Sequence, residues 1–120
     1  MGSTHVRVLL VDADSEGISR FIEMLQAQRA PRFQVEHTPT IAGAERHLRD
    51  SRPDVILLEL SGWQQGGLPM LALLQAIAPA IPIIVTAPSD QEHTALKAVN
   101  QGAQDYVLSD QVYDTLLVRA

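Results

Sequence analysis

The chain has 120 residues, with 14 acidic against 9 basic side chains for a net charge of −5, and it contains no cysteine. This length can bury a self-sufficient core, so one domain spanning residues 1–120 is expected. The lack of cysteine excludes disulfides, thiolate metal sites and thiol catalysis. The negative charge argues against nucleic-acid binding through the general field of the protein.

Neither the N-terminus nor the apolar middle of the chain has the pattern of a targeting or membrane segment. Residues 1–5 are polar and lack the apolar stretch of a signal peptide. Residues 68–85 are largely apolar but are interrupted by Pro69, Pro79 and Pro82, which do not suit a membrane span. We therefore expect a cytoplasmic protein without membrane contact.

The first half of the chain alternates between short apolar strands and amphipathic helices. A strand is predicted at 7–11, and Asp14 or Ser15 would cap the helix after it. The apolar side chains of that helix recur at i, i+3, i+4 and i+7: Ile18, Phe21, Ile22 and Leu25. A second strand is predicted at 33–36. Thr40 would cap the next helix, whose apolar face comprises Ile41, Ala44 and Leu48.

The second half continues the same alternation. Pro53 precedes a third strand at 54–58, and a glycine-rich loop at 61–67 leads into a helix at about 68–78, with Pro69 in its first turn. A fourth strand is predicted at 81–85. Asp90 would cap a helix that ends at residue 100, with Gly102 as its left-handed C-terminal residue. A fifth strand at 105–108 and a last helix at 112–119 complete the pattern.

Strands that alternate with helices predict an α/β fold with a parallel sheet covered on both faces. The right-handed crossover rule limits the topologies, and the flavodoxin-like strand order 2-1-3-4-5 is expected, in three layers. The carboxyl ends of such strands gather at one rim, where open α/β sheets bind ligands. Asp12, Glu59 and Thr86 follow three predicted strands. We expect them to meet at this rim, as in a phosphoryl or metal site.

Segments along nearly the whole chain carry a family resemblance. They are the first strand with Asp12, residues 53–60 around Glu59, Gly67-Leu68, residues 82–87 with Thr86 followed by Ala87, and Gly102-Ala103-Gln104-Asp105-Tyr106. In this order and spacing they resemble the receiver domain of bacterial two-component response regulators. The resemblance implies a signal-transduction domain of a phosphorelay, without enzymatic activity of its own and cut from, or N-terminal in, a longer signalling protein.

The resemblance also implies a set of functional residues, which this sequence keeps only in part. In the family, two adjacent acids hold Mg²⁺, an Asp takes the phosphoryl group, and a Thr or Ser and a Lys contact the phosphate. Asp12 and Thr86 match this set. Ala13 replaces the second acid, Glu59 replaces the acceptor Asp, and Ser109 stands in place of the Lys. We therefore expect a degenerate receiver, a pseudo-receiver, with Mg²⁺ binding lost or weak and no cofactor.

Three functions stay open at this point. The first is a non-phosphorylatable dimerisation or docking module, whose partners would be a second copy, an attached output domain, a histidine kinase or a phosphotransfer protein. The second is a working phosphoacceptor that uses Glu59 or a neighbouring residue. The third is a small enzyme or ligand binder, which fold alone does not exclude, although no Walker A or dinucleotide glycine fingerprint is present.

Single residues also carry a functional and a structural interpretation. Asp12 could hold metal or only its own loop, and Thr86 could serve a switch or simply the strand. Tyr106 matches the family's switch aromatic, yet packing would explain it as well. A possible partner surface comprises Trp63, Tyr113, Leu116 and Leu117, and Trp63 could instead pack over its loop. The four histidines lack metal-ligand spacing and are expected to be solvated: His5, His37, His47 and His93.

Overall fold

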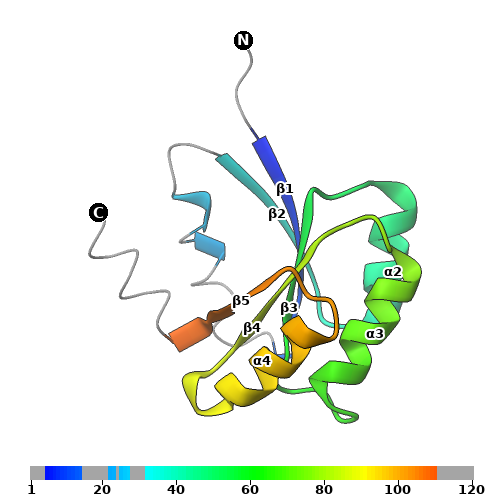
Figure 1. Ribbon diagram of the computed structural model, residues 1–120. Coiled ribbons are helices and arrows are strands. Elements are labelled where there is room, and N and C mark those ends of the chain that lie inside the picture. The colour runs from blue at the N-terminus through cyan, green and yellow to red at the C-terminus, as the bar shows by residue number, and fades with distance from the viewer. Residues whose placement is uncertain (1–4, 15–21, 24, 28–31, 111–120) are drawn as a thin grey trace.

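Parallel strands form one sheet in the order β2-β1-β3-β4-β5, as the sequence predicted (Figure 1). The computed structural model of the protein describes residues 5–14, 22–23, 25–27 and 32–110. The strands are β1 His5–Val11, β2 Arg32–Thr38, β3 Val55–Glu59, β4 Ile83–Ala87 and β5 Asp105–Leu108. The helices that the structure describes from end to end are α2 Ile41–Asp50, α3 Gly67–Ile77 and α4 Glu92–Asn100, and a short 3₁₀ turn, η1 Ser89–Gln91, precedes α4.

The sheet is buried on both faces because its central strands alternate apolar side chains between two clusters. Leu9 and Val11 of β1 belong to the larger cluster, to which α2, α3 and α4 contribute buried residues such as Leu71 and Leu74. Val8 and Leu10 point to the other face, as the two-residue period of a strand requires. On that face Ile22 and Leu25 pack against the sheet, in agreement with the predicted apolar stripe. Three residues of that prediction, the candidate cap Ser15 and the stripe residues Ile18 and Phe21, lie outside the described part of the chain, as does the last predicted helix, 112–119.

The predicted residues at the ends of two helices, Thr40 and Gly102, are confirmed. The hydroxyl of Thr40 accepts a hydrogen bond from the Gly43 N–H at 2.9 Å and caps α2. Gly102 has a φ of 113°, and bonds from Gly102 N–H to Val99 O and from Ala103 N–H to Ala98 O close α4. This is the Schellman arrangement, for which glycine is the favoured residue.

The prediction that Asp90 caps α4 is wrong. Asp90 lies inside η1, and α4 begins after Gln91, without a side-chain cap. Pro88 and the η1 turn lead the chain into α4 instead, because the Gln91 N–H bonds the Pro88 carbonyl at 2.8 Å.

Strand β4 is shifted by two residues from the predicted 81–85. The Ile81 N–H bonds Ala78 O within a turn, and Pro82, which has no N–H, only accepts a bond from Ile56 N–H. Regular pairing therefore begins at Ile83 and continues through Thr86 to Ala87. The shift places Thr86 within the strand, directly opposite Glu59 in register.

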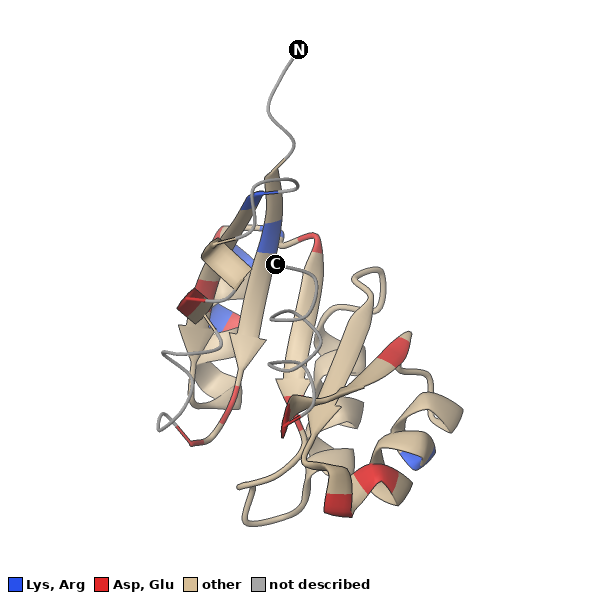
Figure 2. Cartoon of the chain, turned by 90° about the vertical axis from the view of Figure 1, so that its left-hand side faces the viewer, with Lys and Arg blue, Asp and Glu red and all other residues tan. Residues whose placement is uncertain are grey.

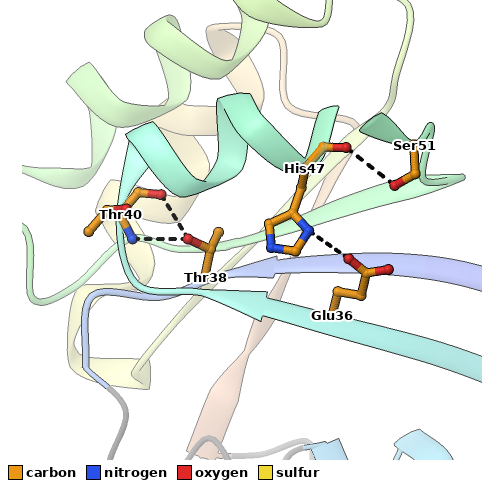
Figure 3. A network of polar contacts seen from close by, with 5 residues as sticks. All are labelled: Glu36, Thr38, Thr40, His47 and Ser51. Atoms are coloured by element: carbon orange, nitrogen blue, oxygen red, sulfur yellow. Dashed lines mark hydrogen bonds and ion pairs between the residues drawn. The ribbon is translucent and has the colours of Figure 1, made fainter. Parts of the chain in front are cut away.

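A polar network fastens α2 to the edge strand β2 (Figure 3). His47 Nδ1 lies 2.6 Å from Glu36 Oε2, and the Ser51 hydroxyl donates to the His47 carbonyl at 3.2 Å. The Thr38 hydroxyl bonds the backbone of Thr40 where the strand turns into the helix. The expectation that every histidine is solvated is therefore wrong for His47, because the fold brings an acid of β2 against it.

Candidate functional site

The carboxyl ends of β1, β3, β4 and β5 bring the predicted site residues to one rim of the sheet. Val11 pairs with Leu58, so Asp12 follows β1 beside Glu59, the last residue of β3. Glu59 pairs with Thr86. Ser109 directly follows β5 at the same end of the sheet. The predicted meeting of these residues follows from the parallel register.

Both carboxylate oxygens of Glu59 are engaged by neighbouring donors. The side chain is only 8% exposed. Its Oε1 accepts a hydrogen bond from the Thr86 hydroxyl at 2.9 Å. Its Oε2 accepts from the Ser61 N–H at 3.0 Å and from the Ser61 hydroxyl at 2.8 Å. A buried carboxylate needs such donors, because its desolvation would otherwise be costly. Glu59 is thus held between Thr86 of the paired strand β4 and Ser61 of its own following loop.

The loop after β3 is fixed over Glu59 by close contacts. Trp63 Nε1 donates to the Glu59 carbonyl at 2.7 Å, and the half-buried indole packs against the core. Gly67 begins α3 so close to Leu60 that a Cβ there would lie 2.3 Å from the Leu60 carbonyl oxygen. These contacts favour the packing interpretation of Trp63 over that of an exposed partner anchor.

Asp12 lies half-buried at the end of β1 with a carboxyl group that ionises with difficulty. Burial raises its pKa to about 6, the Glu59 and Asp14 charges add to this, and a hydrogen bond from the Asp14 N–H acts in the opposite direction. That bond, 2.9 Å to Asp12 Oδ1, ties the carboxylate to its own loop. His37 Nε2 lies 3.3 Å from the Asp12 carbonyl oxygen, so this histidine also has a protein neighbour.

Tyr106 connects β5 to the beginning of α4. Its half-buried ring packs against the core, and its hydroxyl donates to Glu92 Oε2 at 2.8 Å. This hydrogen bond raises the pKa of the phenol above its ordinary value of 10.0. The sequence contained no signal for the pair, because the two residues belong to different elements and the bond depends on how α4 packs against β5.

A further acid, Asp110, occupies the rim next to Ser109. Asp110 accepts hydrogen bonds from the Ser89 N–H at 2.9 Å and from the Ser89 hydroxyl. The Ser89 hydroxyl lowers the pKa of the Asp110 carboxyl. The bond joins the end of β5 to the loop after β4. Sequence reasoning missed Asp110, Ser89 and Ser61, since short polar residues after strands are also ordinary turn residues.

The rim is acidic, and no basic residue lies in the segments that form it. Residues 12–14, 59–61, 86–91 and 109–110 contain five acids and no Lys, Arg or His: Asp12, Asp14, Glu59, Asp90 and Asp110. Figure 2 shows acidic residues in red around the ends to which the strand arrows point. The one lysine of the sequence, Lys97, is exposed in the middle of α4. Within the described ranges, no group of three or more His, Cys, Asp or Glu side chains could hold a metal ion.

Part of the predicted partner surface lies outside the described residues, namely Tyr113, Leu116 and Leu117. Among the helices that the structure describes, none is long and apolar enough to cross a membrane.

Comparison with known proteins gives concordant matches. The model of the response regulator receiver domain family matches residues 8–119. The transcriptional regulatory protein PrrA of Mycobacterium tuberculosis is 27% identical over 118 residues, which are 98% of this chain and 49% of that protein. The chain thus spans about half the length of this curated relative.

Solved structures share the fold. The N-terminal signal receiver domain of a two-component response regulator from Bacteroides fragilis superposes with a TM-score of 0.76 at 22% identity, covering 96% of this chain and 95% of that one. The beryllofluoride-activated NtrC4 receiver domain dimer gives a TM-score of 0.73 at 21% identity, covering 93% and 90%.

Proposed function

The chain belongs to the response regulator receiver domain family, and from that premise we propose that it is a receiver that takes no phosphoryl group. It would act instead as a dimerisation or docking module in two-component signalling. The curated relative PrrA is about twice as long as this chain and is named a transcriptional regulatory protein. We accordingly propose that the domain works within a longer protein, beside an output domain, and catalyses no reaction itself.

The observation that carries this proposal is that the hydrogen-bond donors around the acceptor position are already bonded to the Glu59 carboxylate. In the family, the Thr hydroxyl contacts the phosphoryl group, but here the Thr86 hydroxyl donates to Glu59 Oε1. Both donors of Ser61 are bound to Glu59 Oε2. A nucleophilic carboxylate that accepts three hydrogen bonds is stabilised in its ground state, and the groups that would stabilise the transferred phosphoryl are committed.

The donor set around the pocket does not fit a Mg²⁺ ion, which demands near-octahedral oxygen ligands. The Ala13 side chain supplies no oxygen. Asp12 Oδ1 accepts the Asp14 N–H, and both oxygens of Glu59 are bonded to protein donors. The proposed function therefore requires no bound Mg²⁺.

The charge of the rim supports the same conclusion. Phosphoryl transfer depends on positioning and on cations that neutralise the charge that develops on the phosphoryl oxygens. Ser109 offers a hydroxyl where the family has an ammonium group, and Asp110 beside it adds a negative charge. An anionic phosphodonor would approach strand-end segments that carry five acids and no Lys or Arg, with His37 beside Asp12 as the neighbouring basic side chain.

Mass measurement of the intact protein after incubation with acetyl phosphate and Mg²⁺ tests this proposal. The wild type should stay unmodified, and so should Glu59→Asp alone, because the metal and cation defects remain. The triple variant Ala13→Asp, Glu59→Asp, Ser109→Lys restores all three groups and should acquire one phosphoryl adduct. It therefore serves as the positive control for the fold and the donor.

Two results would contradict the proposal. One is a phosphoryl adduct on the wild type that disappears in Glu59→Gln, which would establish the working phosphoacceptor instead. The other is labelling of Glu59→Asp by itself, since that would mean that the acceptor residue was the only defect.

A further inference from the structure

Helix α3 carries no charge on any side. From Leu60 to Ser89, a quarter of the chain, the sequence contains no Asp, Glu, Lys, Arg or His. The one polar side chain of the helix, Gln75, is half-buried and donates to the Gln101 carbonyl at 2.9 Å. Nothing else on α3 can interact with water or with a partner through a polar side chain.

The outward face of α3 is nevertheless exposed. Met70, Leu71 and Leu74 form the buried face, whereas Leu73 on the opposite side is 46% exposed. Its exposed neighbours are apolar as well: Pro69, Ala72 and Ala76. A surface helix normally has a polar outer face, and a helix that is apolar all round is normally buried. The outer face of α3 therefore has the composition of a surface that is covered in an assembly.

Charged side chains border this face on the two helices between which α3 packs. On α2, Arg49 and Glu45 form an ion pair at 3.7 Å, and both are exposed. On α4, Lys97 is exposed. An apolar centre surrounded by polar residues of both signs is the usual anatomy of a protein–protein interface.

We infer that the outer face of α3 is the contact through which two copies of this chain associate. A two-fold axis places the same surface of both copies against each other, so a charged centre would repel itself, whereas the uncharged α3 would not. The flanking helices carry both signs, so unlike charges can face each other around the centre. Leu73 of one copy would lie against Ala72 and Ala76 of the other. The inference rests on the proposed docking role but is independent of phosphorylation.

The area of the outer face of α3 determines how strong the dimer is expected to be. Helix α3 has 11 residues, and at about 1.5 Å per residue it is roughly 16 Å long. A stable interface buries about 800 Å² on each partner, more than the face of one such helix offers. The dimer should therefore be weak, in the micromolar range, and should involve the borders on α2 and α4.

Two exposed leucines provide a matched pair of variants. Leu73 on α3 and Leu96 on α4 are 46% and 49% exposed, so a glutamate at either position should leave the fold intact. Leu96 lies one turn after Glu92, which bonds Tyr106 of β5, so it is on the side of α4 near β5. The Gln75–Gln101 bond marks the opposite side, next to α3. Leu96→Glu thus introduces the same charge away from the α3 face.

Sedimentation equilibrium from low to high micromolar concentration, with far-ultraviolet circular dichroism to verify folding, decides the inference. The wild type should dimerise, Leu73→Glu should raise the dissociation constant about tenfold or more, and Leu96→Glu should leave it unchanged. A wild type that stays monomeric would overturn the inference. So would a dimer that Leu96→Glu disrupts and Leu73→Glu does not, although the docking role would then survive on the α4–β5 side. Whether the protein is phosphorylated is measured separately, by the intact-mass experiment, so the two proposals can fail independently.

Discussion

Replacing Asp12 by asparagine should stabilise the protein at neutral pH. The carboxyl group of Asp12 is half-buried and stands near the charges of Glu59 and Asp14, which together with burial raise its pKa from 3.8 to about 6. Its ionised form is therefore disfavoured in the folded state. Asp12→Asn removes the charge and keeps an oxygen that can accept the Asp14 N–H.

The magnitude follows from the shift of the pKa. A rise from 3.8 to about 6, at about 1.4 kcal/mol per unit, gives an upper value of about 3 kcal/mol. Water screens a half-buried group, so about 1–2 kcal/mol is the expected gain at pH 7.5. A raised pKa stabilises the folded state fully below the unfolded pKa of 3.8, and this contribution is lost as the pH rises through about 6. The advantage of the variant should therefore disappear between pH 6 and pH 4.

Urea unfolding of wild type and variant at a series of pH values between 4 and 7.5 measures this difference. Asp50→Asn removes one negative charge from an exposed position on α2, away from the rim, and controls for the change in net charge. The reasoning is refuted if Asp12→Asn gives no gain at pH 7.5, or if its gain persists unchanged at pH 4.

Three further substitutions test other contacts. Thr86→Val removes the hydroxyl that donates to Glu59 and should lower the free energy of unfolding by about 1.5–3 kcal/mol in urea titrations; wild-type stability would contradict the observed bond. Gly67→Ala places a Cβ 2.3 Å from the Leu60 carbonyl oxygen and should cost about 1–3 kcal/mol, whereas an unchanged urea midpoint would mean that the loop can shift freely. Glu92→Gln should lower the pKa of Tyr106 toward 10.0. The pKa is measured from the tyrosinate absorbance, and the Tyr106→Phe variant identifies the part of that absorbance that belongs to Tyr106. An unshifted titration would disprove the pairing.

Much of the fold and the location of the site were predictable because they depend on local chemistry. Short apolar runs bounded by proline, glycine and polar residues indicated the strands, and parallel strands have their carboxyl ends at one edge of the sheet. Asp12 and Glu59 therefore had to share a rim with Thr86 once their strands were identified. The cap at Thr40 and the left-handed Gly102 were predictable for the same reason, since each depends on a few consecutive residues.

The interactions within the rim required the tertiary structure. Glu59 and Thr86 are 27 residues apart, and their hydrogen bond depends on the register between β3 and β4, which the pattern of apolar residues did not reveal. The raised pKa of Asp12 arises from burial, which is a property of the packed chain.

For the outer face of α3, too, the sequence determines the composition and only the structure determines which residues are exposed. Its sequence shows a helix without charge, but apolar residues occur all round it, so no periodicity separates the side that faces the sheet from the side that faces outward. Only the packing of Leu71 and Leu74 into the core identifies Leu73 as the exposed residue. Sequence determines which side chains a helix carries, and packing against the sheet decides which of them remain available to a partner.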